Sequence, residues 1–170
     1  MDIRRLDPQD APDYQAVRVR ALWEYPDAFT SSYEEDIDKP IEAAEKRLGD
    51  TNRMFWGAFV DGHLCGMVGL ERETRTKNRH KAHVVGMYVM PEQAGGGIAR
   101  ALLDALLAQA RESGVEVLVL TVTQGNKPAQ VLYESVGFHS FGVEPRAIKV
   151  DGRYHAKNHM VLELNPRSPL

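Results

Sequence analysis

The stretch that decides the fold is residues 88–100, Tyr88-Val89-Met90-Pro91-Glu92-Gln93-Ala94-Gly95-Gly96-Gly97-Ile98-Ala99-Arg100. An apolar extended segment stops at Pro91, three glycines form a tight turn, and a helical pattern starts at Ile98. The first backbone N–H groups of a helix have no partner within it, and the helix dipole places about half a positive charge there. Because glycines leave these donors accessible, the segment predicts a phosphate-binding site; the alternative is a turn that only packs a helix against a sheet.

Two familiar phosphate loops do not match this turn. The P-loop needs a lysine followed by serine or threonine, and neither pair occurs here. The dinucleotide fingerprint needs a third glycine where Arg100 stands, and Glu116, the acid at a suitable distance, starts a strand instead of ending one. Nucleotide binding by a Rossmann-like domain is therefore disfavoured.

The pattern on either side of the turn predicts an α/β fold. Ile98, Leu102 and Leu106 mark the apolar stripe of one helix, which ends at Ser113-Gly114. Three hairpin-type strands precede the turn and a strand–helix–strand crossover follows it, which requires a mixed sheet with helices on its faces. We expect strands at 3–6, 54–60, 63–71, 83–90, 115–122, 138–143 and 160–164, a hairpin extension at 147–155, and helices after Pro8, after Pro40, at 98–112 and at 128–136.

Length and composition limit the class of protein. The chain has 170 residues, 43% of them hydrophobic, which is enough for one domain over residues 1–170. Its net charge of −3 argues against nucleic acid or an anionic membrane as the main partner. The single cysteine, Cys65, excludes an internal disulfide, and the N-terminus has no apolar core typical of a signal peptide. We therefore expect a cytoplasmic protein.

Residues 88–100 resemble the acetyl-CoA-binding motif of the GNAT superfamily of N-acetyltransferases. Val89 and Pro91 match the start of that motif, Gly97 takes the position of its glycine, and Ala99 takes its Gly/Ala position. Ala94 stands where the family usually has glutamine or arginine, which removes a side chain from the pyrophosphate site.

A second segment, residues 126–138, resembles the same family. It follows the pattern Asn-x-x-Ala-x-x-Leu-Tyr-x-x-x-Gly-Phe, and the matching residues are Asn126, Ala129, Leu132, Tyr133, Gly137 and Phe138. The resemblance implies a mixed, mostly antiparallel central sheet of six to seven strands flanked by about four helices. It also implies an N-acetyltransferase that moves the acetyl group of acetyl-CoA to a primary amine of a small molecule or protein, by direct attack through a tetrahedral intermediate.

The resemblance also assigns roles to residues. Tyr133 is the implied general acid for the departing thiolate, its alternative being a core tyrosine. A backbone N–H near Val89, at a bulge of its strand, is the implied oxyanion donor. Asn126 has an alternative role as a helix N-cap. The implied coenzyme-binding residues are Met87, Tyr88, Val89, Ala94, Gly95, Gly96, Gly97, Ile98, Ala99, Arg100, Asn126 and Ala129.

The acceptor side is less clear from the sequence. Residues 27–38 combine aromatic and acidic side chains suited to a cationic amine, and the alternative is an exposed acidic loop. The candidate acceptor-binding residues are Phe29, Tyr33, Glu34 and Glu35. Many family members carry a carboxylate base on the strand at 83–89, which has none here, so Glu71, His83 or bulk water are the possible substitutes.

Two further questions concern metals and partners. His155 and His159 would lie about 13 Å apart along a strand, too far to share an ion, so we expect no metal. The expected partner is an amine acceptor, and a homodimer is possible. A non-catalytic acyl-CoA-binding module is the competing class, supported by Ala94 and the missing strand acid.

Overall fold

The computed structural model describes residues 1–165, which fold around one seven-stranded sheet. The strand order is β1-β2-β3-β4-β5-β7-β6, and only β4 and β5 run parallel. The strands are β1 (Asp2–Arg5), β2 (Arg53–Val60), β3 (His63–Arg72), β4 (Lys81–Val89), β5 (Val117–Thr123), β6 (His139–Val150) and β7 (Arg153–Glu163). The helices are α1 (Ala11–Glu24), α2 (Tyr33–Asp36), α3 (Ile41–Leu48), α4 (Ile98–Glu112) and α5 (Lys127–Ser135).

The expected fold class is confirmed, with two differences in detail. The short helix α2 was not expected; it is one turn, held by a capping box in which Ser32 and Glu35 bond each other's backbone N–H groups. The strand expected at 138–143 and the hairpin extension at 147–155 form one long hairpin, β6–β7, with register shifts after Ser140 and Glu144. The polar residues between the two predicted segments lie in the β-bulges at these register shifts. Hydrophobic alternation does not predict such bulges, because an inserted residue breaks the alternation.

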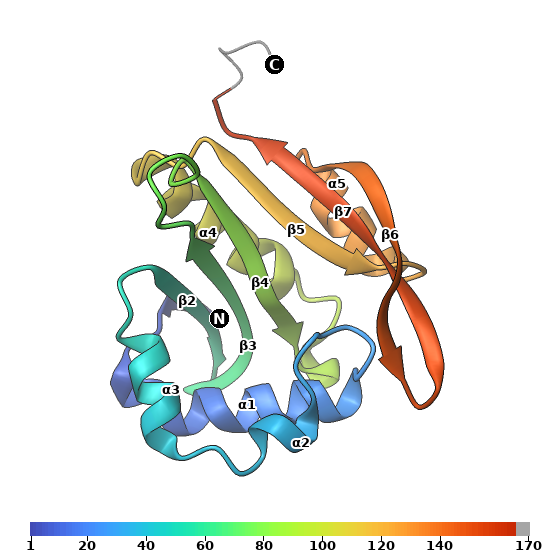
Figure 1. Cartoon of the computed structure of the whole chain (residues 1–170). Helices are drawn as coiled ribbons and strands as arrows, with labels where there is room; N and C mark the ends of the chain where they lie inside the picture. Colours follow the sequence, from blue (N-terminus) through green and yellow to red (C-terminus); the bar gives the residue numbers. More distant parts are fainter. Residues whose placement is uncertain (166–170) are drawn as a thin grey trace.

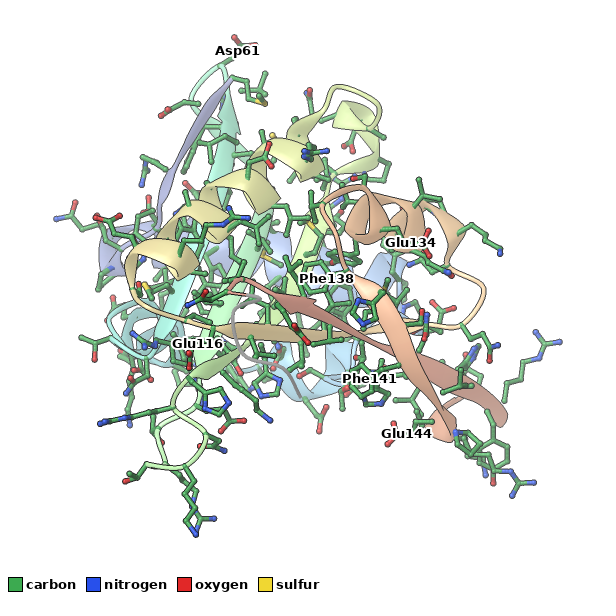
Figure 2. The ribbon with its side chains drawn as sticks, turned by 90° about the horizontal axis from the view of Figure 1, so that it is seen from above. Asp61, Glu116, Glu134, Phe138, Phe141 and Glu144 are labelled. Carbon is green, nitrogen blue, oxygen red and sulfur yellow. The ribbon has the colours of Figure 1, made fainter. Side chains whose placement is uncertain are left out.

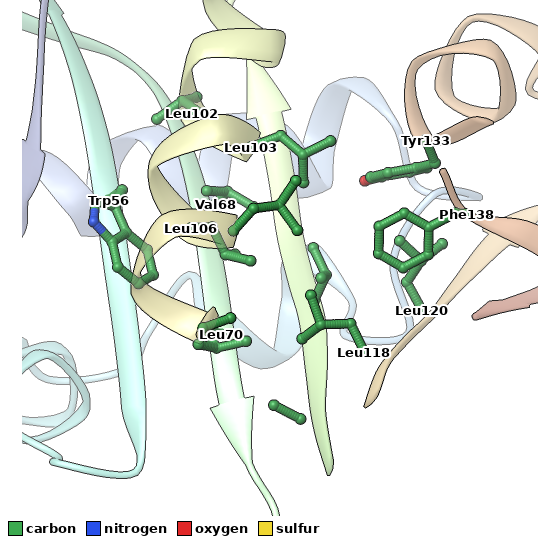
Figure 3. Close-up of a cluster of buried hydrophobic side chains, with 14 of the residues drawn as sticks. Trp56, Val68, Leu70, Leu102, Leu103, Leu106, Leu118, Leu120, Tyr133 and Phe138 are labelled. Carbon is green, nitrogen blue, oxygen red and sulfur yellow. The ribbon is translucent and has the colours of Figure 1, made fainter. Parts of the chain in front are cut away.

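The helices cover both faces of the sheet. Helices α4 and α5 lie on one face, and α1, α2 and α3 lie on the other (Figure 1). Leu102, Leu103 and Leu106 of α4 are fully buried and face Val68 and Leu70 of β3 (Figure 3). Burying a leucine side chain contributes about 1.5–3 kcal/mol, so this stripe fixes α4, and with it the glycine turn, against the sheet.

The sheet opens between β4 and β5. These strands pair only through Lys81–His83 and Val117–Val119, and then diverge (Figure 1). The expected bulge is present in β4: Val85 lies opposite Gly69 and Tyr88 opposite Met67, so β4 has one residue more than β3 over this span. Gly86, within the bulge, has a φ of 63°, a conformation that glycine adopts without steric cost. The bulge bends β4 away from β5.

Candidate active site

A cavity of about 360 Å³ occupies the opening between β4 and β5. Its walls come from the bulge of β4, the end of β5, helix α5 and the loop after α1, and the lining residues include Val85, Gly86, Met87, Thr121, Thr123, Asn126, Ala129, Tyr133 and Phe29. Met87 and Ala129 also pack against the core under α4 and α5, whereas Val85 and Phe29 pack against the core under α1 and α3. The cavity therefore joins the two faces of the sheet.

The glycine turn presents free backbone donors on the α4 side. Gly95 and Gly97 have φ angles of 81° and 78°, and a Cβ built on either would meet no atom within 4 Å. Residues 95–97 are exposed, and within residues 1–165 no backbone N–H of residues 95–100 has a hydrogen-bond acceptor. An open cradle of N–H groups at the start of a fifteen-residue helix is suited to a phosphate anion.

Three residues of this turn make other contacts, one through its backbone and two through their side chains. The N–H of Ala94 donates to the carbonyl of Pro91 at 3.1 Å, and the Ile98 side chain is buried in the core. Arg100 donates to Asp104 at 3.0 Å and to Ser135 at 3.4 Å, which connects α4 to α5. Ile98 can therefore contribute only its backbone to a ligand.

Strand β4 contributes mainly backbone to the opening. The Met90 N–H donates to the Cys65 carbonyl at 2.8 Å, and because antiparallel ladder bonds alternate, the Val89 N–H points away from β3, toward the opening. The Tyr88 side chain is buried on the α1 side, and its hydroxyl donates to Glu24 at 2.7 Å. Burial and this hydrogen bond to a carboxylate raise the pKa of Tyr88, so its hydroxyl stays protonated.

Helix α5 places the two motif residues of its segment on the cavity. Asn126 caps the helix, its Oδ1 accepting from the Ala129 N–H at 3.4 Å, and it also lines the cavity. The Tyr133 side chain is 7% exposed and its ring lies against Phe138, with centroids 5.8 Å apart. Phe138 lies inside the molecule below α5 (Figure 2), whereas Glu134 is exposed.

The Tyr133 hydroxyl is a free polar group of this wall. It points from α5 toward α4 (Figure 3), and among residues 1–165 it makes no hydrogen bond. Burial raises the pKa of Tyr133, so the phenol carries its proton at neutral pH. A protonated, unpartnered hydroxyl at a cavity wall has the geometry of a proton donor.

The cavity is also lined by charged side chains, three of which the sequence did not point to. Arg18, Arg47 and Lys157 line it together with Glu71. Arg47 lies 3.4 Å from Glu71, and Arg18 lies 2.6 Å from the buried Asp36. Arg18 and Arg47 adjoin buried residues of α1 and α3. A charged residue on the apolar face of a predicted helix is therefore the sequence signal that could have identified both arginines. The strand pattern around Lys157 contains no such signal.

Three of the four expected acceptor-binding residues lie together. Phe29, Tyr33 and Glu34 line one hollow beside the β6–β7 hairpin, and Phe29 also lines the cavity between β4 and β5. The Tyr33 ring packs on Trp23 with centroids 5.1 Å apart, and the Glu35 carboxylate accepts from the Ser32 N–H at 2.7 Å. Recognition of the acceptor by these four residues stays a prediction.

The candidates for the general base separate clearly in space. Glu71 lines the cavity. The Nε2 atom of His83 lies 2.7 Å from Glu73, and His83 is outside the cavity lining. Strand β4 has no acidic residue, and the carboxylate that lines the cavity is that of Glu71 on β3.

The described residues contain neither a cluster of metal-ligating side chains nor a helix able to span a membrane. Over residues 1–165, His, Cys, Asp and Glu side chains form no group of three or more that is arranged to hold a metal ion. In the same residues, no helix has the length and apolar character needed to cross a membrane. His159 lies 3.7 Å from Glu144, and both are on the β6–β7 hairpin.

Comparison with known proteins identifies the family. The model of the acetyltransferase (GNAT) family matches residues 18–138. Over 114 residues the chain is 36% identical to N-alpha-acetyltransferase RimI of Mycobacterium tuberculosis, a match covering 66% of this chain and 69% of that protein. The chain therefore belongs to the GNAT acetyltransferase family, and the family inferred from the two motifs is confirmed.

Solved structures agree on the fold. A GNAT-family acetyltransferase from Streptococcus pneumoniae superposes with a TM-score of 0.87 at 25% identity, covering 96% of this chain and 99% of that one. The yncA protein of Salmonella typhimurium, whose structure contains its cofactor acetyl-CoA, superposes with a TM-score of 0.86 at 23% identity, covering 100% and 97%. At these identities the likeness concerns the fold.

Proposed function

We propose that this chain transfers the acetyl group of acetyl-CoA to the amine of a small acceptor, in the cavity between β4 and β5. The observation that carries the proposal is that this one cavity reaches both faces of the sheet and has Tyr133 in its wall. A volume of 360 Å³ lies at the lower end of the roughly 300–1,000 Å³ typical of ligand sites, which favours a small acceptor.

The residues on the α4 side fit coenzyme A. The open cradle at Gly95 and Gly97, with its free N–H groups, accommodates a pyrophosphate. Beyond His83 the edge of β4 is unpaired on its β5 side, so it can bond the amide-like pantetheine arm as a further strand would. Ala94 adds no side-chain contact, and the fit rests on backbone groups.

The chemical step needs one proton to move from nitrogen to sulfur overall. The acceptor nitrogen attacks the acetyl carbon directly, a carbon–nitrogen bond forms, and the carbon–sulfur bond breaks. The Val89 N–H stabilises the charge that develops on the carbonyl oxygen, an effect worth about 10²–10³ in rate for one such donor. Tyr133 gives its proton to the departing sulfur, and the proton released by the nitrogen passes to Glu71 or to water.

A non-catalytic acyl-CoA-binding module is the competing function. Ala94 and the absence of an acid in residues 83–89 favour it, whereas Glu71 in the cavity and the free Tyr133 hydroxyl favour catalysis. Incubating the protein with acetyl-CoA and a panel of amines, and measuring free thiol, separates the two. Thiol release that depends on the amine supports the enzyme. Stabilisation by acetyl-CoA without any thiol release supports the binding module, and stabilisation by NAD instead of coenzyme A would refute both.

A further inference from the structure

Lys157 is a buried cation whose hydrogen-bond partner is neutral, and Glu144, opposite it in the β6–β7 hairpin, favours its charge only from beyond ion-pair distance. Its residue is 8% exposed, and its ammonium donates to the Thr30 hydroxyl at 2.8 Å. No carboxylate in residues 1–165 lies within ion-pair distance of it. An ammonium has three donors, and burying one without an opposite charge costs free energy unless something else compensates it.

A second cation shares the same end of the cavity. Arg18 donates to the Ser31 hydroxyl at 3.1 Å, and Ser31 follows Thr30 directly in the loop after α1. Asp36 faces Arg18 at 2.6 Å and also contacts Lys39, so this one carboxylate serves two cations. All of Arg18, Thr30, Ser31 and Lys157 line the cavity.

The other charged pair of the cavity is internally balanced. Arg47 and Glu71 lie 3.4 Å apart and come from α3 and β3. Among the charged side chains that line the cavity, Lys157 therefore has no carboxylate paired with it, and Arg18 shares Asp36 with Lys39. A cavity lined by surplus cations and by a carboxylate is suited to a ligand that has both an anionic group and an amine.

We propose that the acceptor is an amine carrying a carboxylate, of the size of a single amino acid, and that Lys157 binds this carboxylate with Arg18 beside it. The inference rests on the proposed acetyl transfer. The cavity has room for a single amino acid, and its surplus cations disfavour a polyamine, which has no anionic group. Burial lowers the pKa of Lys157, and a bound carboxylate restores it, so acceptor binding also stabilises the charge of this lysine.

Matched acceptors test the inference directly. The twenty L-amino acids, their carboxamides and spermidine are each offered with acetyl-CoA, and kcat/KM is measured from thiol release. We expect at least one amino acid to exceed its own carboxamide about 10- to 100-fold, the range for a hydrogen bond to a charged group. Carboxamides or spermidine used as well as the acids would overturn the inference and leave acetyl transfer intact. So would use of no amino acid by a protein that acetyl-CoA stabilises.

Variants of Lys157 locate the effect. Lys157→Met should raise the KM for the preferred acid about tenfold or more, leave its carboxamide unchanged, and leave the KM for acetyl-CoA unchanged. Lys157→Arg should restore part of the preference, and Lys46→Met, an exposed lysine of α3, is the control. Melting temperatures verify that each variant folds. A fall in kcat for acid and carboxamide alike would assign Lys157 to proton transfer and refute the carboxylate site.

Discussion

Replacing Tyr133 with phenylalanine removes one oxygen atom and little else. The ring keeps its contact with Phe138 and its place in the core. The lost hydroxyl makes no hydrogen bond within residues 1–165, so no protein partner is left unsatisfied. We therefore expect the free energy of unfolding to change by less than about 1 kcal/mol, the usual net worth of one hydrogen bond.

The effect on turnover should be much larger. General acid catalysis contributes about 10²–10⁴-fold to a rate. A thiol with a pKa near 8.5 leaves more readily than an alcohol, so we expect the lower end, a fall in kcat of about 100-fold. Because burial raises the pKa of Tyr133, the wild-type rate should show no loss from its ionisation at neutral or mildly alkaline pH.

The assay is thiol release at saturating acetyl-CoA, with the amine at a concentration where chemistry limits the rate. Acetyl-CoA affinity, measured by calorimetry, should stay within about twofold, because only a hydroxyl is lost. Tyr154→Phe, an exposed tyrosine of the β6–β7 hairpin, is the matched control. A kcat for Tyr133→Phe within about twofold of wild type would show that the residue is only a core tyrosine.

Three further changes examine the coenzyme cradle, the buried ion pair and the acidic loop. Gly97→Val should reduce the affinity for acetyl-CoA, measured by calorimetry, tenfold or more. The control is Gly114→Val, at the other end of α4 with a similar φ of 76°, which should cost similar stability and leave the affinity unchanged. Equal affinities in both variants would show that the pyrophosphate does not bind at this turn. Burial opposes ionisation of Asp36, but Lys39 and Arg18 together lower its pKa below the ordinary value near 3.9. The ionised carboxylate should therefore stabilise the fold fully above about pH 3.9, and this stabilisation should disappear as the pH falls through the lowered pKa. Asp36→Asn should accordingly lose about 3 kcal/mol in urea unfolding at pH 7 and match wild type in strong acid; a loss independent of pH would contradict the ion pair. Charge reversal of both Glu34 and Glu35 to lysine should change the KM for the amine less than about twofold, since neither carboxylate lines the cavity, and a tenfold rise would instead support recognition of a cationic amine by this loop.

The sequence by itself determined the features that depend on local backbone chemistry. The run Gly95–Gly97 before Ile98 predicts a tight turn with free helix donors, because glycine tolerates tight turns and the first turn of any helix lacks acceptors. In the structure Gly95 and Gly97 have positive φ angles. The Asn126–Phe138 segment likewise carries its own cap and its own buried tyrosine. The spacing of hydrophobic residues, alternate in strands and three to four apart in helices, was sufficient to predict the order of most strands and helices.

Only the tertiary structure decided what faces the cavity. Arg18, Glu71 and Lys157 are far apart in the chain and come together because α1, β3 and β7 border one opening in the sheet. That opening depends on where the pairing of β4 with β5 stops, which is set by long-range register and not by either strand alone. The sequence predicts an acidic acceptor site in the loop after α1; in the structure Glu35 caps α2, Glu34 lines a neighbouring hollow, and a lysine from β7 lines the cavity. The sequence gives the charge of each side chain, whereas packing between elements distant in the chain determines which groups that side chain contacts.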